Sequence, residues 1–100
     1  MTKESGEVVR LTDLPNIGAT AAAKLLEAGI STPEQLRKLG SVEAALRIKV
    51  ESREDAPCRS MLSGLEGAIR GVRWHAIDKA ERDQLWHRYQ ERLKEGAAGE

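Results

Sequence analysis

Aromatic residues and cysteine are scarce in this chain. Its 100 residues include two tryptophans, one tyrosine and no phenylalanine. A core without aromatic bulk has to be built from Leu, Ile, Val and Ala, which favours closely packed helices. The one cysteine, Cys58, excludes an internal disulfide bond.

The sequence also lacks long apolar runs and an excess of charge of one sign. No run approaches the ~20 apolar residues that span a bilayer, and the N-terminus lacks the apolar core of a signal peptide. We therefore expect a cytoplasmic protein without membrane contact. Lys and Arg number 16 and so do Asp and Glu, which gives a net charge of zero. Dedicated nucleic-acid binders usually carry a basic excess, because neutralising phosphates drives their binding.

Helical periodicity runs through most of the chain, and no segment alternates with the period of two that is typical of a strand. We predict an all-α fold, a compact bundle of about five helices that contains a helix-hairpin-helix-like turn. The expected helical segments are a short piece near Leu11–Leu14 and helices over 19–28, 33–39, 41–49, 58–70 and from Asp78 through Leu93. Residues 51–57 are predicted as a loop and residues 72–75 as an extended connector. The expected organisation is a flexible lead-in over 1–9, a single domain over 10–95 and a flexible tail over 96–100.

The helix predicted over 58–70 contains two glycines, Gly64 and Gly67. Each costs about 0.5–1 kcal/mol relative to alanine inside a helix. We expect that these glycines are tolerated because another part of the backbone packs closely against this helix. The helix is therefore expected at the centre of the fold. Since the core lacks phenylalanine, at least one of Trp74 and Trp86 is expected to pack against it.

The segment Leu14-Pro15-Asn16-Ile17-Gly18 predicts a turn of the helix-hairpin-helix kind, with Asn16 in place of the usual first glycine. Asn tolerates the left-handed backbone conformation better than most residues do. Backbone N–H groups at the start of the following helix can bind a phosphate. The candidate phosphate or DNA contacts are Ile17, Gly18, Ala19, Thr20 and Lys24. No Lys or Arg follows Gly18 directly, so a structural or protein-binding use of the turn is favoured over DNA binding.

A second candidate surface consists of Arg70, Arg73, Trp74 and His75. Basic residues beside an exposed tryptophan can contact a protein partner or single-stranded nucleic acid. The alternative is a solvated face whose cations lie favourably at the end of a helix. We favour the solvated face, because surface clusters of this kind are common.

Catalytic and metal-binding patterns are not found. His75 and His87 are the only histidines, and a zinc site needs three or four ligands. A nucleophilic pair of Cys58 and His75 would lack both an orienting group and an oxyanion loop. We therefore expect no metal, no cofactor and no enzymatic activity.

Several motifs together resemble the C-terminal domain of the TfoX/Sxy proteins. They are Leu14-Pro15-Asn16-Ile17-Gly18, Leu25-Leu26-Glu27-Ala28-Gly29-Ile30, Thr32-Pro33-Glu34-Gln35-Leu36, Leu39-Gly40-Ser41-Val42-Glu43-Ala44, Leu65-Glu66-Gly67-Ala68-Ile69-Arg70-Gly71 and Trp74-His75. The resemblance covers roughly residues 10–80, and its most specific part is the glycine-bearing segment with Trp74-His75. It implies an all-helical domain and a link to the bacterial regulation of natural DNA uptake. Full-length members carry an additional N-terminal α/β domain, so the resemblance implies a stand-alone C-terminal domain here, and it implies no catalytic residue.

From these observations we expect a non-enzymatic regulatory or adaptor domain that acts through protein–protein contacts with an unidentified partner. The alternative is weak, sequence-independent DNA binding through the hairpin turn. The sequence leaves open whether the chain forms a homo-oligomer.

Overall fold

The computed structural model describes residues 10–51 and 58–98. Over these residues the secondary structure is helical, with no strand, which confirms the predicted all-α fold of about five helices. The elements are η1 (Leu11–Asp13), α2 (Ala19–Glu27), α3 (Pro33–Leu39), α4 (Ser41–Glu51), α5 (Arg59–Arg70), η2 (Trp74–Ala76) and α6 (Lys79–Ala98), where η denotes a 3-10 helix. The lead-in predicted over 1–9 and residues 52–57 of the predicted loop lie outside the described residues, whereas Glu51, the first residue of that predicted loop, is the last residue of α4.

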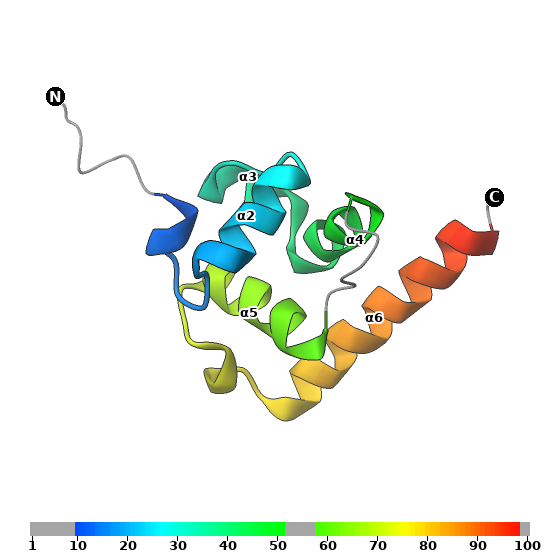
Figure 1. Cartoon of the computed structure of the whole chain (residues 1–100). Helices are drawn as coiled ribbons and strands as arrows, with labels where there is room; N and C mark the ends of the chain where they lie inside the picture. The colour runs from blue at the N-terminus through cyan, green and yellow to red at the C-terminus, as the bar shows by residue number, and fades with distance from the viewer. Residues whose placement is uncertain (1–9, 52–57, 99–100) are drawn as a thin grey trace, which may run out of the picture.

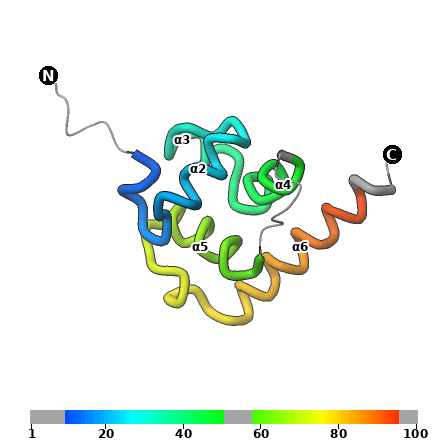
Figure 2. Tube along the Cα trace, in the orientation of Figure 1, coloured from blue at the N-terminus to red at the C-terminus, as the bar shows by residue number. Residues whose placement is uncertain are grey.

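Helix α5 lies at the centre of the fold, as its glycines predicted. It packs against α3, α4, α6 and η2. Helix α6 packs against α5 and α4 as far as Arg92, whose side chain pairs with Glu43 of α4, and its C-terminal end extends past the other helices (Figure 1). The chain trace in Figure 2 shows that the turn before α2 and the connector after α5 lie side by side, although more than 50 residues separate them in the sequence.

The core is built from aliphatic side chains, as the lack of phenylalanine predicted. Its largest fully buried side chains are Leu25, Ile30, Leu36, Ile48, Leu62, Leu65 and Tyr89. Half-buried Trp86 packs against this core and stacks on Tyr89 with ring centroids 5.3 Å apart. This contact confirms the core position expected for one tryptophan, whereas Trp74 stays 36% exposed.

Two helix ends follow their sequence signals closely. At the start of α3 the backbone N–H of Gln35 donates to Thr32 Oγ1 (3.1 Å), and the Gln35 side chain accepts from the Thr32 N–H (3.2 Å). This reciprocal pair is a capping box. At the end of α5, Gly71 has a φ of 80° and ends the helix, and the Val72 N–H donates to the carbonyl of Gly67 (2.9 Å). The left-handed conformation of Gly71 directs the chain back across α5.

Two predicted boundaries are wrong. The connector over 72–75 is not fully extended, because η2 begins at Trp74 and is closed by hydrogen bonds from Ala76 to Arg73 and from Ile77 to Trp74. Such a turn satisfies backbone groups where the chain changes direction between two helices. Helix α6 continues to Ala98, past Leu93, where the predicted helix ends. Adding a residue to an existing helix costs little, and alanine is the best helix former.

The predicted turn is present, with Asn16 in the left-handed conformation at a φ of 71°. Its first arm is η1, a single 3-10 turn of three residues in place of an α-helix. The assignment to the helix-hairpin-helix class therefore stays a prediction.

Candidate binding groove at the hairpin turn

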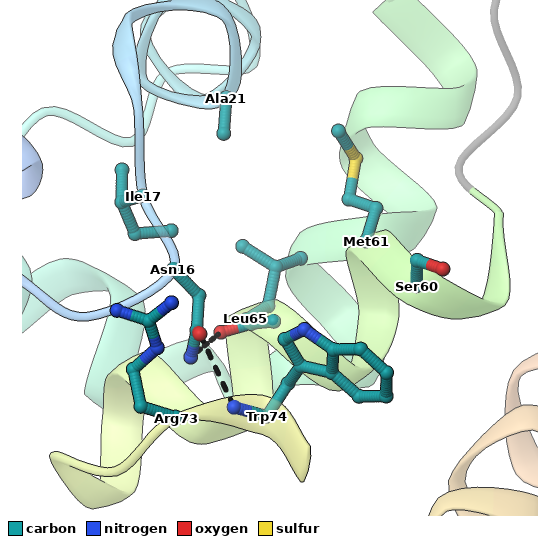
Figure 3. A pocket seen from close by; sticks show the side chains of 9 residues that line it. Asn16, Ile17, Ala21, Ser60, Met61, Leu65, Arg73 and Trp74 are labelled. Carbon is teal, nitrogen blue, oxygen red and sulfur yellow. Dashed lines mark hydrogen bonds between the residues drawn. The ribbon is translucent and has the colours of Figure 1, made fainter.

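The Asn16 side chain connects three segments of the chain. Its Nδ2 group donates to the carbonyls of Gly64 (3.3 Å) and Val72 (2.9 Å). Its Oδ1 accepts from the backbone N–H of Trp74 (3.1 Å) (Figure 3). The hairpin turn is thereby joined to α5 and to the connector that precedes α6. The sequence indicated the backbone conformation of Asn16 but not this bridging role.

The glycines of α5 make room for these contacts. A Cβ atom on Gly67 would lie 2.5 Å from Asn16 Nδ2 and 2.6 Å from the carbonyl oxygen of Val72, both closer than Cβ atoms come to non-bonded neighbours in proteins. A Cβ atom on Gly64 would lie 3.4 Å from the Asn16 Cβ, which is an ordinary contact. The close backbone approach predicted for these glycines is confirmed, and Gly67 is the position that requires it most strictly.

A groove opens beside this bridge, and we name it the Trp74 groove. It encloses about 310 Å³, and its walls are Asn16, Ile17 and Ala21 near the start of α2, Ser60, Met61, Gly64 and Leu65 of α5, and Arg73 and Trp74 of the connector. In Figure 3 the Trp74 ring extends from the connector toward Met61 and Ser60 on α5. A second hollow of about 250 Å³ shares Trp74 and Ser60, so the indole stands between two concave surfaces.

The groove brings together residues from the two candidate sites that the sequence indicated separately. Ile17, from the candidate phosphate contacts, lines the groove with Arg73 and Trp74, from the candidate partner surface. The other phosphate candidates lie outside its walls: Gly18, Ala19 and Thr20 are exposed at the start of α2, and Lys24 is half-buried further along that helix. His75 does not line the groove, but its ring lies edge-on to Trp74, with ring centroids 5.4 Å apart.

Two arginines, Arg73 and Arg82, lie close to Trp74. The Arg82 guanidinium lies over the indole ring, 5.1 Å from its centroid, and its Nε donates to the carbonyl of Ile77 (2.9 Å). This cation–π contact covers one face of the ring. Within residues 10–51 and 58–98, neither Arg73 nor Arg82 forms an ion pair with a carboxylate. Arg73 therefore presents its charge at the groove.

Arg70 forms hydrogen bonds and ion pairs within the fold. Its Nε donates to Glu66 Oε2 (2.7 Å), and its terminal nitrogens donate to the two carboxylate oxygens of Glu81 (3.3 and 3.0 Å). Glu66 also accepts a hydrogen bond from the hydroxyl of buried Ser41 (2.7 Å). Arg70 thus links α4, α5 and α6 and has its charge balanced by two carboxylates. Its place in a partner surface stays a prediction.

The contact between Arg70 and Glu81 makes the stability of the fold depend on pH. The hydrogen bond from Arg70 lowers the pKa of the Glu81 carboxyl group. This contribution to stability is complete above the ordinary glutamate pKa and is lost as the pH falls through the lowered value. We expect Glu81→Gln to lower the Tm at pH 7, and we expect the difference from the wild type to shrink below about pH 4. Thermal unfolding at both pH values, followed by circular dichroism, tests this; a difference that is unchanged at low pH would contradict it.

The described part of the chain brings together no group of three or more His, Cys, Asp or Glu residues that could hold a metal ion. Cys58 is exposed at the start of α5. On α6, His87 Nε2 lies 3.2 Å from Glu91 Oε2. None of the helices in the described ranges is both long enough and apolar enough to cross a bilayer.

Comparisons with known proteins agree with this fold. Two crystal structures from Listeria monocytogenes resemble the chain, one described as an uncharacterized protein in a triclinic form and the other as a protein of unknown function in a tetragonal form. The first has a TM-score of 0.75 and 42% identity over 83% of this chain and 92% of its own. The second has a TM-score of 0.73 and 43% identity over 81% of this chain and 96% of its own. No curated protein matches the sequence significantly. The TfoX C-terminal domain family matches residues 8–89, and the chain belongs to this family.

Proposed function

We propose that this domain is a non-enzymatic regulatory or adaptor module that binds another protein through the Trp74 groove. The observation that carries the proposal is the combination of a partly exposed tryptophan and an arginine without an ion-pair partner among the described residues at an apolar cavity. Tryptophan and arginine are the residues most often found at the energetic centre of protein interfaces. The bridge through Asn16 holds the groove in place, so little conformational entropy is lost on binding.

The family connects this role to a biological setting. The resemblance to TfoX/Sxy proteins suggests that the module takes part in the bacterial regulation of natural DNA uptake. An adaptor role in that setting is supported by the zero net charge of the chain, because a protein that acted through DNA alone would be expected to carry a basic excess.

The proposal predicts a partner whose capture depends on Trp74. The immobilised chain is incubated with a lysate of the organism that encodes it, beside the variants Trp74→Ala and Val50→Ala. Val50 is 75% exposed at the end of α4 and lies outside the groove, so Val50→Ala is a matched control for loss of an exposed apolar side chain. We expect a defined protein that the wild type and Val50→Ala recover equally and that Trp74→Ala recovers at least about tenfold less. Equal recovery by all three, or recovery of no protein, would contradict the proposal.

Weak binding of duplex DNA is the alternative, and one observation favours it. The N-terminus of α2 has no side-chain cap, and Gly18, Ala19 and Thr20 are exposed there. Fluorescence anisotropy with a labelled duplex at low salt separates the two functions. We expect no binding; binding that weakens steeply with salt and is reduced in Gly18→Glu would support the alternative. A Cβ atom at exposed Gly18 meets no other atom within 4 Å, so the added side chain starts in open space.

A further inference from the structure

We infer that the ligand of the Trp74 groove is a short acidic peptide segment, in which one apolar side chain enters the cavity and a neighbouring carboxylate binds Arg73. This inference rests on the proposed function and adds the chemistry of the partner. It follows from three properties of the groove: the nature of its walls, the charges around Trp74 and the surroundings of the indole ring.

The walls of the groove select an apolar anchor. Ile17, Ala21, Met61 and Leu65 contribute hydrocarbon or thioether surface to a cavity of about 310 Å³. An apolar side chain that enters this space is removed from water and contacts three segments of the fold, namely the start of α2, helix α5 and the connector. Methionine is flexible enough to adapt to anchors of different shape, which suits a site that accepts Leu, Ile, Met or Phe.

The charges around Trp74 select an acidic segment. Four cationic side chains and one carboxylate line the two hollows: Arg59, Arg73, Lys79, Arg82 and Asp83. The carboxylate of Asp83 already pairs with both Arg59 and Lys79. The surroundings of Trp74 are therefore basic although the whole chain has no net charge. Complementary charge raises the specificity for an acidic partner and the rate at which it associates.

The surroundings of the indole ring favour a peptide over single-stranded nucleic acid. Proteins that bind single strands stack successive bases on several aromatic side chains. This chain has three aromatic residues, and two of them, Trp86 and Tyr89, stack on each other. One face of the third, Trp74, is covered by Arg82. The three aromatic residues therefore do not form a row on which successive bases could stack, whereas a single apolar side chain can pack beside the Trp74 ring.

The inference is tested by selecting ligands without assuming their sequence. A phage-displayed library of random twelve-residue peptides is selected on the full chain, and the affinities of synthetic copies of the enriched peptides are measured by fluorescence anisotropy. We expect enriched peptides to contain Leu, Ile, Met or Phe within two residues of Asp or Glu. Their affinity is expected to fall at least about tenfold in Arg73→Glu and to weaken with rising salt.

Two further variants separate the groove from the rest of α2. Ala21→Leu fills the cavity from a helix that tolerates leucine well, and it is expected to weaken the same peptides about tenfold. Leu26→Ala, at a 57% exposed position of α2 that does not line the groove, is expected to leave their affinity unchanged. Because Arg73 is exposed, Arg73→Glu gives a readout even if Ala21→Leu disturbs the packing of α2.

The outcomes distinguish this inference from the proposed function. Peptides that bind in the groove but are basic or lack an apolar anchor would overturn the inference and leave the adaptor role intact. Displacement of the peptides by an equal concentration of single-stranded oligothymidine would overturn it in favour of nucleic acid. Peptides whose affinity is unchanged in both Arg73→Glu and Trp74→Ala, or a library without groove-binding peptides, would count against the inference and the groove as a docking site together.

Discussion

Gly67→Ala is expected to destabilise the domain by about 3 kcal/mol, the upper end of the range for overpacking. In an exposed helix the same change would stabilise the fold by about 1 kcal/mol, because alanine is the better helix former. Here the added methyl group would lie 2.5 Å from Asn16 Nδ2 and 2.6 Å from the carbonyl oxygen of Val72. Neither group can move without breaking the hydrogen bond that joins them, so either the connector or α5 has to shift.

Gly64→Ala is the matched control for this prediction. It lies three residues earlier on the same helix, and its added Cβ would make an ordinary contact of 3.4 Å with the Asn16 Cβ. We expect a change between zero and a stabilisation of about 1 kcal/mol. Urea unfolding of both variants, followed by far-ultraviolet circular dichroism, gives the two free energies. Equal effects of the two substitutions would contradict the close contact described at Gly67.

Asn16→Ala is expected to cost about 2–3 kcal/mol of stability, the second largest effect. The substitution removes three hydrogen bonds, and a net contribution of about 1 kcal/mol is typical for each bond that is not exposed to water. It also places an alanine at a φ of 71°, a conformation that costs an L-residue without a hydrogen-bonding side chain about 1 kcal/mol or more. Partial exposure of the bonds reduces the first contribution and keeps the total in the stated range.

Asn16→Gly separates the two contributions. Glycine adopts a positive φ freely, so this variant removes the hydrogen bonds and keeps the conformation. We expect it to lose about 1–2 kcal/mol, less than Asn16→Ala in the same urea titration. A glycine variant as stable as the wild type would show that Asn16 serves only the conformation of the turn.

The local structure of this chain is largely predictable from its sequence, because its signals act over a few residues. The capping box of Thr32 and Gln35 and the left-handed Asn16 each follow from the preferences of individual side chains. The close approach at Gly67 was predictable as a contact, since a helix-interior glycine needs a reason. The 3-10 turn at Trp74 was not predictable in the same way, because three residues are too few to show a period.

The groove could not be predicted, because its parts meet only in the folded chain. Asn16 and Val72 are 56 positions apart in the sequence, and nothing in either segment indicates the other. The sequence presents Arg70 as a surface cation, because nothing in it gives the position of Glu81 on α6 relative to α5. Nor does the sequence indicate that Arg82 covers one face of Trp74. Sequence reasoning identified Trp74 and Arg73 but not the cavity beside them.

The measurement that tests the role of Asn16 in the groove most directly is hydrogen exchange at the Trp74 backbone N–H, followed by NMR in the wild type and in Asn16→Gly. This N–H donates to Asn16 Oδ1, whereas the hydrogen bonds that close η2 are donated by Ala76 and Ile77. We expect the exchange rate at the Trp74 N–H to be at least about tenfold higher in the variant. The exchange rate of the Leu65 amide in α5 is expected to change only as far as the global stability changes. Equal exchange at Trp74 in the two proteins would contradict the claim that Asn16 holds the groove together.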